Sequence, residues 1–284
     1  MGLLLLTTLG MVCQNVYAKQ EISSEIGRPK DKGKWKKKDG EKYYLKADGE
    51  WAVKSCKIEG TYYVFDMEGK LLHPRKNTLV RVGKKIYYVS PKGTAVSGWH
   101  IIKKKLYSVA KTGAVRTDRK YEGITLTETG AAKMNKAAKM KMKIMQVFKK
   151  VTDPQKTKKQ NLRACWNYVV SRKFHYRMKY PNINKKGWQI TTAYDMFTTK
   201  KGNCYSFACA FAAMAKELGY KPKIVCGRVS GSRDRARDHL TKHAWVRIDG
   251  YNYDPEAQYA GWMRGIYHSS QYPIRHTIQK VVTY

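Results

Sequence analysis

Residues 202–220, GNCYSFACAFAAMAKELGY, are the stretch that decides how the second half of this chain folds. After Cys204, apolar residues recur three and four positions apart, which is the spacing of a helix with one buried face. Asn203 is a favourable N-cap and Gly219 a favourable stop signal, so the helix is predicted to begin at Cys204. Free backbone N–H groups and the positive dipole end in the first turn favour a thiolate and can face an oxyanion. Cys204 is therefore a candidate nucleophile.

A second stretch, HAWVRIDGYNYDPE, begins at His243 and is predicted to form a hairpin. Asp249 and Gly250 are a strong signal for a two-residue turn. With that turn, Asp254 opposes Trp245 and lies on the same sheet face as His243, so the two side chains can hydrogen-bond. A helix-initial thiol, a strand histidine and an orienting acid together form a Cys-His-Asp nucleophilic site.

Other interpretations of these residues remain open. A cysteine near a helix start is commonly a small buried hydrophobic residue, and a strand histidine beside aromatic residues is commonly a packing residue. The trio could also be a relic of a catalytic site. His239 and His243 have the spacing of zinc ligands on a helix, but this stretch is predicted as a loop followed by a strand. We favour catalysis because the three features coincide, and no sequence feature requires a metal or an organic cofactor.

The two stretches together resemble the catalytic core of the transglutaminase-like superfamily, a papain-like α+β fold. The resemblance rests on the order Cys, His, Asp, on Gly202, on the His-Ala-Trp triplet and on the Asp-Pro pair. It implies that Cys204 is the nucleophile, His243 the general base and acid, and Asp254 the orienting acid. It further implies acyl-thioester chemistry on a peptide or protein substrate. A peptidase or amidase is slightly favoured over an amine-accepting cross-linking enzyme, and a catalytically inactive wall-binding or adhesion protein is the alternative.

The sequence before the Cys204 helix predicts further helices and two pocket residues. A helix is expected to begin near Ala131, either packing as the first helix of the catalytic domain or binding a membrane surface. Another is expected over NLRACWNYVVSRKF. Trp188 and Tyr194 are candidates for the acyl pocket or a second oxyanion donor, with ordinary packing as the alternative.

Between about residues 33 and 130 the chain repeats itself. The units EKYYLKADGEWA, TYYVFDMEGKLL, KIYYVSPKGTAV, KLYSVAKTGAV and ITLTETGAA carry glycines spaced 20, 24, 20 and 17 residues apart. Each unit is predicted to be a hairpin made of an aromatic strand, a polar turn with a glycine, and a second apolar strand. A period near 20 predicts an all-β solenoid of stacked hairpins, because one hairpin cannot bury its own face.

These units resemble the cell-wall-binding repeats of Gram-positive surface proteins, including the choline-binding type. Such repeats usually start with Gly-Trp, which here fits well only at Gly98-Trp99, with Trp35 and Trp51 as partial matches. Aromatic side chains can bind quaternary ammonium groups or stack on sugars. The alternative is that they only pack one hairpin against the next. The candidate wall-ligand residues are Tyr43, Tyr44, Trp51, Tyr62, Tyr63, Tyr87, Tyr88, Trp99 and Tyr107.

The N-terminal sequence MGLLLLTTLGMVCQNVYA predicts a signal peptide, although no lysine or arginine precedes its apolar run. That run is too short to span a membrane, so we expect no transmembrane helix and a secreted or surface protein of a Gram-positive-type bacterium. The predicted organisation is a signal peptide at 1–18, a linker at 19–32, repeats at 33–132 and a catalytic domain at 133–284.

The chain is strongly basic, with 57 Lys and Arg, 21 Asp and Glu and a net charge of +36. The net charge is +13 over residues 19–132 and +23 over residues 133–284. This excess predicts a polyanionic partner such as a cell-wall glycopolymer, and no motif for specific nucleic-acid recognition is present. After cleavage the chain would hold five cysteines: Cys56, Cys165, Cys204, Cys209 and Cys226. An odd count fits one free thiol, and pairing among the others stays open.

Overall fold

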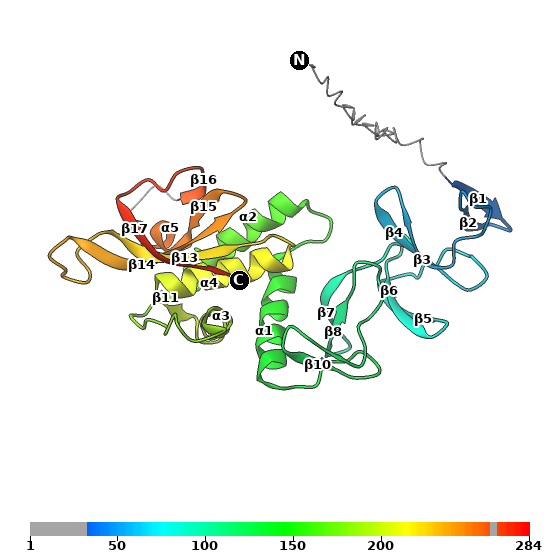
Figure 1. The fold of residues 1–284 in the computed structure, drawn as a ribbon, viewed down its shortest axis with the longest axis horizontal. Helices are drawn as coiled ribbons and strands as arrows, with labels where there is room; N and C mark the ends of the chain where they lie inside the picture. The colour runs from blue at the N-terminus through cyan, green and yellow to red at the C-terminus, as the bar shows by residue number, and fades with distance from the viewer. Residues whose placement is uncertain (1–32, 262–265) are drawn as a thin grey trace, which may run out of the picture.

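The computed structural model describes residues 33–261 and 266–284, so the predicted signal peptide and linker lie outside the described residues. Figure 1 shows an elongated molecule in which small β-hairpins lie on one side of helix α1 (Lys136–Val151) and an α+β half on the other. Among the described residues no helix is both long and apolar enough to cross a membrane. The predicted fold class, hairpin repeats followed by an α+β domain, is confirmed.

The repeat half is a series of two-stranded antiparallel sheets. Their strands are β1 (Lys34–Lys38) with β2 (Glu41–Leu45), β3 (Lys54–Ile58) with β4 (Thr61–Phe65), β5 (Thr78–Val82) with β6 (Lys85–Val89), β7 (Gly98–Ile102) with β8 (Lys105–Val109), and β9 (Arg119–Tyr121) with β10 (Ile124–Leu126). Two-residue turns join the paired strands. In the first, Asp39 and Gly40 both have positive φ (51° and 80°), as a type I′ turn requires.

The strand partners within each unit differ from the prediction. The aromatic strand pairs mainly with the segment before it, as Tyr44 does with Trp35. The apolar segment after the glycine forms only one bridge back, for example Leu45 with Trp51. A two-residue turn in which both residues have positive φ allows regular pairing along the two strands that it joins. The longer turn that ends at Gly49 brings only one pair of residues together.

Successive repeat units are joined through their backbones. The amide of Val64 donates to the carbonyl of Gly93, and the amide of Tyr88 donates to the carbonyl of Gly113, both at 2.9 Å. At Gly113, φ is +81° and an added Cβ would lie 2.8 Å from the Cβ of Ala95 in the preceding unit. Glycine is needed there for the left-handed backbone and for the close approach of neighbouring units.

The α+β half contains a five-stranded antiparallel sheet in the order β16–β15–β14–β13–β17 and a short parallel pair, β11 with β12. The remaining elements are α2 (Lys158–Val169), β11 (His175–Tyr176), α3 (Trp188–Thr199), β12 (Lys201–Gly202), α4 (Cys204–Glu217), β13 (Lys223–Ser230), β14 (Leu240–Ile248), β15 (Tyr251–Asp254), α5 (Pro255–Ala260), β16 (Ile266–Ser269) and β17 (His276–Thr283).

Helix α4 forms the centre of the main core, because its residues from Cys204 to Ala215 are all buried. Ala244 and Val246 of β14 pack in the same core, whereas Trp245 packs in a second cluster with Ala257 and Tyr272. Side chains alternate along a strand, so His243 lies on the Trp245 side of the sheet.

The register of the β14–β15 hairpin agrees with the prediction. Val246 pairs with Tyr253, and the turn residues Asp249 and Gly250 have φ of 49° and 87°. This register brings the ends of the two strands, where His243 and Asp254 lie, beside each other.

The two halves meet at α1 in a shared apolar cluster that holds Trp99 and Leu126 of the repeats and Met145 of α1. An ion-pair network covers the cluster. Lys141 of α1 lies 3.2 Å from Glu122 of the last hairpin and 2.6 Å from Glu217 of α4. The last repeat is therefore packed directly on the α+β half.

Candidate active site

The backbone around Cys204 places this residue at the first position of α4. Asn203 is extended (φ −103°, ψ −170°), and its side-chain oxygen caps the helix by accepting the amide of Ser206. The Asn203 amide group also donates to the carbonyl of Lys179 at 3.1 Å. Gly202 is required because an added Cβ would clash with the Ser206 side chain. These contacts fix the start of the helix and so the position of the thiol.

His243 and Asp254 are brought together in the interior. Their side chains are 1% and 0% exposed, and His243 Nε2 lies 2.6 Å from Asp254 Oδ2. A carboxylate can only accept, so the Nε2–H of His243 is the donor. This contact leaves Nδ1 for proton transfer at the other side of the ring.

Further hydrogen bonds hold the Asp254 carboxylate. Oδ1 accepts the amide of Ala257 at 3.0 Å, because Asp254 is also the N-cap of α5. Oδ2 accepts the hydroxyl of Tyr272 at 2.6 Å. Burial, together with the Asp254 carboxylate, raises the pKa of Tyr272, so the phenol stays protonated and donates. Local sequence patterns gave no signal for Tyr272, which reaches the site from a segment 18 residues downstream.

The thiol of Cys204 is a hydrogen-bonding partner of His243. Burial alone would lower the pKa of His243, but the Asp254 carboxylate and the charge and hydrogen bond of Cys204 outweigh it and raise that pKa well above its usual value. An imidazole beside a cysteine sulfur is the arrangement of a base next to a nucleophile. Cys204 has no exposed surface, and its sulfur lies 3.9 Å from the carbonyl oxygen of Lys242. Side chains above the thiol must therefore move before a substrate can reach it.

A second buried carboxylate, missed by the sequence reasoning, lies beside the imidazole. Glu256 is 1% exposed, and its Oε2 lies 3.8 Å from His243 Nδ1. Its Oε1 accepts from Arg233 Nη2 at 3.4 Å, while Arg233 Nη1 donates to the Tyr176 hydroxyl at 2.6 Å. The position of Glu256, two residues after Asp254, was the available signal for it. Arg233 could not be singled out, since it lies in a loop with several arginines.

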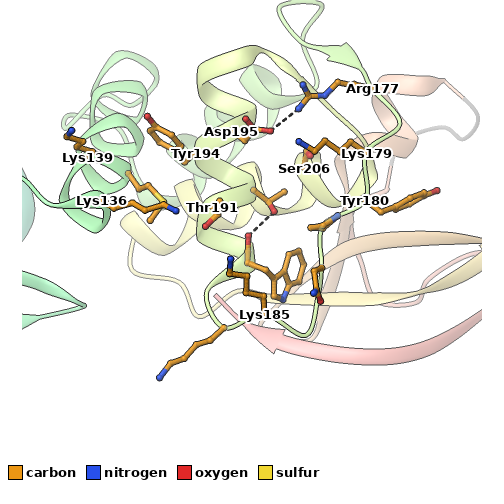
Figure 2. A pocket seen from close by; sticks show the side chains of 16 residues that line it. Lys136, Lys139, Arg177, Lys179, Tyr180, Lys185, Thr191, Tyr194, Asp195 and Ser206 are labelled. Carbon is orange, nitrogen blue, oxygen red and sulfur yellow. Dashed lines mark hydrogen bonds and ion pairs between the residues drawn. The ribbon is translucent and has the colours of Figure 1, made fainter.

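Trp188 and Tyr194 lie on α3, which packs beside the helix that carries Cys204. Both line a cavity of about 770 Å³, shown in Figure 2, and none of the triad residues is part of its lining. Trp188 is 5% exposed and packs edge-on against Tyr205, with ring centroids 6.0 Å apart. Their predicted roles in the acyl pocket stay predictions.

The aromatic residues of the repeats occupy different environments. Tyr87, Tyr88 and Trp99 are buried, and the indole nitrogen of Trp99 donates to Glu122 at 3.1 Å. Trp51 is 44% exposed. The half-buried members are Tyr43, Tyr44, Tyr62, Tyr63 and Tyr107.

A groove of the repeats includes an aromatic residue that the prediction left out. Trp35 contacts the rings of Tyr44 and Tyr63, with centroids 5.2 Å and 5.1 Å away. Trp35 and Tyr63 line a cavity of about 560 Å³ together with four lysines: Lys36, Lys37, Lys42 and Lys92.

All five described cysteines are free. Burial raises the pKa of Cys165 and of Cys226 to about 12 each, and that of Cys209 well above its usual value. Cys204 has His243 as a hydrogen-bonding partner. In the part of the chain that the structure describes, no group of three or more His, Cys, Asp or Glu is placed to hold a metal ion.

Comparison with known proteins places one family over this site. The model of the transglutaminase-like superfamily matches residues 145–264. No curated protein sequence matches the chain.

Solved structures resemble part of this chain at low sequence identity. Choline-binding protein F of Streptococcus pneumoniae is 19% identical, covering 35% of this chain and 40% of that chain, with a TM-score of 0.20. The Cpl-1 endolysin in complex with a peptidoglycan analogue is 21% identical, covering 39% and 40%, with a TM-score of 0.24. Alternansucrase in complex with isomaltononaose is 16% identical, covering 35% and 11%, with a TM-score of 0.19. The chain thus spans at most two fifths of each of these proteins.

Proposed function

We propose that this chain is a cysteine enzyme acting through an acyl-thioester on peptide or side-chain amide bonds, because the model of the transglutaminase-like superfamily matches residues 145–264. The observation that carries the proposal is the buried contact of 2.6 Å between His243 and Asp254, beside the helix-initial Cys204. Neither Asp254 nor His243 is exposed enough for this contact to be a surface ion pair.

The geometry supports a two-step acyl transfer. The Cys204 thiolate attacks the amide carbonyl, forming a C–S bond, and the oxyanion is stabilised by the backbone N–H of Cys204, which has no acceptor inside its own helix. His243 then gives its Nδ1 proton to the leaving nitrogen as the C–N bond breaks. In the second step an attacking water or amine gives a proton to His243, and the C–S bond breaks to release the thiolate.

The acyl acceptor decides between hydrolysis and cross-linking. We favour hydrolysis, so that a peptidase or amidase is the first candidate and an amine-accepting cross-linking enzyme the second. The repeats and the positive charge would hold the secreted protein at a cell-wall glycopolymer of a Gram-positive-type bacterium. The groove at Trp35 and Tyr63, lined by lysines, is a candidate contact for such a polymer.

A non-catalytic wall-binding protein is the second candidate function. The observation in its favour is the complete burial of Cys204. In that case the domain would serve as a ligand-binding module, and the thiol would be a core residue.

Incubation of the protein with solubilised peptidoglycan peptides and a fluorescent primary amine tests the proposal. New amino groups without label in the peptides would indicate hydrolysis, and incorporation of the label would indicate cross-linking. Both products should be absent with Cys204→Ala. Equal product from the wild-type and Cys204→Ala proteins would contradict the proposed chemistry.

A further inference from the structure

A basic cavity lies beside the catalytic helix, outside the triad. It encloses about 770 Å³ between the first turn of α1, residues 177–186 and α3. Figure 2 shows Lys136 and Lys139 on the α1 side and Asp195 with Arg177 on the other. Ser206, which is two positions after Cys204 on α4, forms part of the wall. The cavity therefore borders the helix that carries the candidate nucleophile.

Cationic side chains dominate the lining: Lys136, Lys139, Arg177, Lys179, Lys185 and Lys186. The lining contains one acid, Asp195, which lies 2.8 Å from Arg177. Within residues 33–261 and 266–284, none of the five lysines forms an ion pair. The cavity thus carries positive charge that the described residues do not neutralise, which favours an anionic ligand.

The cavity also holds buried hydrogen-bond donors without a partner. Nε1 of Trp188 and Nε of Arg177 are both buried, and neither has an acceptor among the described residues. Trp188 is 5% exposed, whereas the Arg177 side chain is 37% exposed and only its Nε is buried. A buried donor without an acceptor is unfavourable, and a ligand with carbonyl or carboxylate oxygens would satisfy it after the atoms that cover the donor move aside.

The remaining lining and the connection to Cys204 indicate an extended, partly apolar ligand. Apolar atoms of Tyr180 and Pro181 form part of the wall. The carbonyl of the neighbouring Lys179 accepts from Asn203, the N-cap of the catalytic helix. The ring of Tyr180 packs edge-on against Tyr205, the residue after Cys204, with ring centroids 5.7 Å apart. A chain bound in the cavity would run along residues 177–186 towards Cys204.

We propose that this cavity binds an acidic peptide segment of the acyl donor, with its carboxylates at the lysines and its reactive amide towards Cys204. The inference rests on the proposed acyl-transfer function and adds the substrate class. A peptide fits better than a phosphate-rich polymer, because its carbonyl oxygens can meet the buried donors and its side chains the apolar wall. The catalytic step also requires an amide, which a peptide supplies.

The test measures binding in the full chain carrying Cys204→Ala, so that turnover does not interfere. Fluorescence anisotropy would compare a labelled seven-residue peptide of alternating Glu and Gly with its Gln–Gly counterpart at low salt. The cavity variant adds Lys136→Gln, Lys139→Gln and Lys185→Gln. The control adds Lys149→Gln, Lys150→Gln and Lys159→Gln, three exposed lysines of the same domain outside the cavity.

We expect the glutamate peptide to bind at least tenfold more tightly than the glutamine peptide, and the cavity variant to lose about tenfold in affinity. The control should change less than threefold, and thermal unfolding should show that both variants fold. Equal binding of the two peptides, or equal losses in cavity and control variants, would overturn the proposal. The proposal would also be overturned if a glycerol-phosphate polymer bound more tightly than the peptide and if the cavity variant lost affinity for the polymer but not for the peptide. An unreactive Cys204 in the wild-type protein would instead contradict the acyl-transfer function and leave the binding result standing.

Discussion

The substitution Tyr272→Phe isolates one hydrogen bond of the candidate active site. The Tyr272 hydroxyl donates to Asp254 Oδ2 at 2.6 Å, and both residues are buried. The phenol ring stacks on Trp245 with centroids 4.3 Å apart, and phenylalanine would keep this contact. The substitution therefore removes the hydrogen bond without opening a cavity.

The size of the effect follows from the charge of the acceptor. A hydrogen bond to a charged group contributes about 1.5–3 kcal/mol to stability, so we expect Tyr272→Phe to lower the free energy of unfolding by about 2 kcal/mol. For a chain of this size that loss corresponds to a fall in melting temperature of roughly 4–8 °C. Urea unfolding followed by circular dichroism would measure it.

Tyr253→Phe is the matched control. Tyr253 is also buried, and its hydroxyl bonds to Nδ1 of His268 at 2.8 Å rather than to a carboxylate. Loss of this bond should cost about 1 kcal/mol. If Tyr272→Phe costs no more than Tyr253→Phe, the Tyr272 hydroxyl does not donate to an ionised Asp254, and the account of how that carboxylate is held is wrong.

Two further predictions concern the junction of the halves and the start of α4. Burial opposes ionisation of Glu122, but the charges of Lys141 and Lys216 outweigh burial and lower the pKa of this carboxyl. The ionised carboxylate therefore stabilises the fold above the ordinary pKa of 4.5, and this stabilisation is lost as the pH falls through the lowered pKa. Glu122→Gln should therefore destabilise the protein at pH 7 by about 1–3 kcal/mol and less at pH 3; an equal loss at both pH values, in thermal unfolding, would contradict this. Gly202→Ala should lower the free energy of unfolding in urea by about 1–3 kcal/mol, because the new Cβ clashes with Ser206. In the control Gly187→Ala the new Cβ meets no atom within 4 Å, and the positive φ alone should cost about 1 kcal/mol. Equal costs would show that crowding at the helix start is unimportant.

Local signals in the sequence were sufficient to predict the helix that begins at Cys204 and the hairpin that carries His243 and Asp254. The N-cap Asn203 sets where α4 begins, and the Asp249–Gly250 turn sets the register that places Asp254 beside His243. Both signals act over a few residues, so neighbouring side chains and backbone preferences decide the outcome.

Contacts made over long distances in the chain could not be predicted. Tyr272 and Arg233 reach the site from loops whose sequences have no periodicity, and only the folded sheet brings them to Asp254 and Glu256. In the repeats each aromatic strand has a glycine-containing turn on both sides, so the sequence pattern alone did not show which flanking segment becomes the main partner.

The most direct test of the central claim is the rate at which iodoacetamide alkylates Cys204 between pH 4 and 9, located by peptide mass spectrometry. Cys56 serves as an internal reference, because burial raises its pKa and it has no imidazole partner in the described structure. We predict that Cys204 reacts faster than Cys56 well below pH 8 and that His243→Ala removes this advantage. Alkylation of Cys204 no faster than that of Cys56, in both the wild-type protein and His243→Ala, would contradict an activated nucleophile at this site.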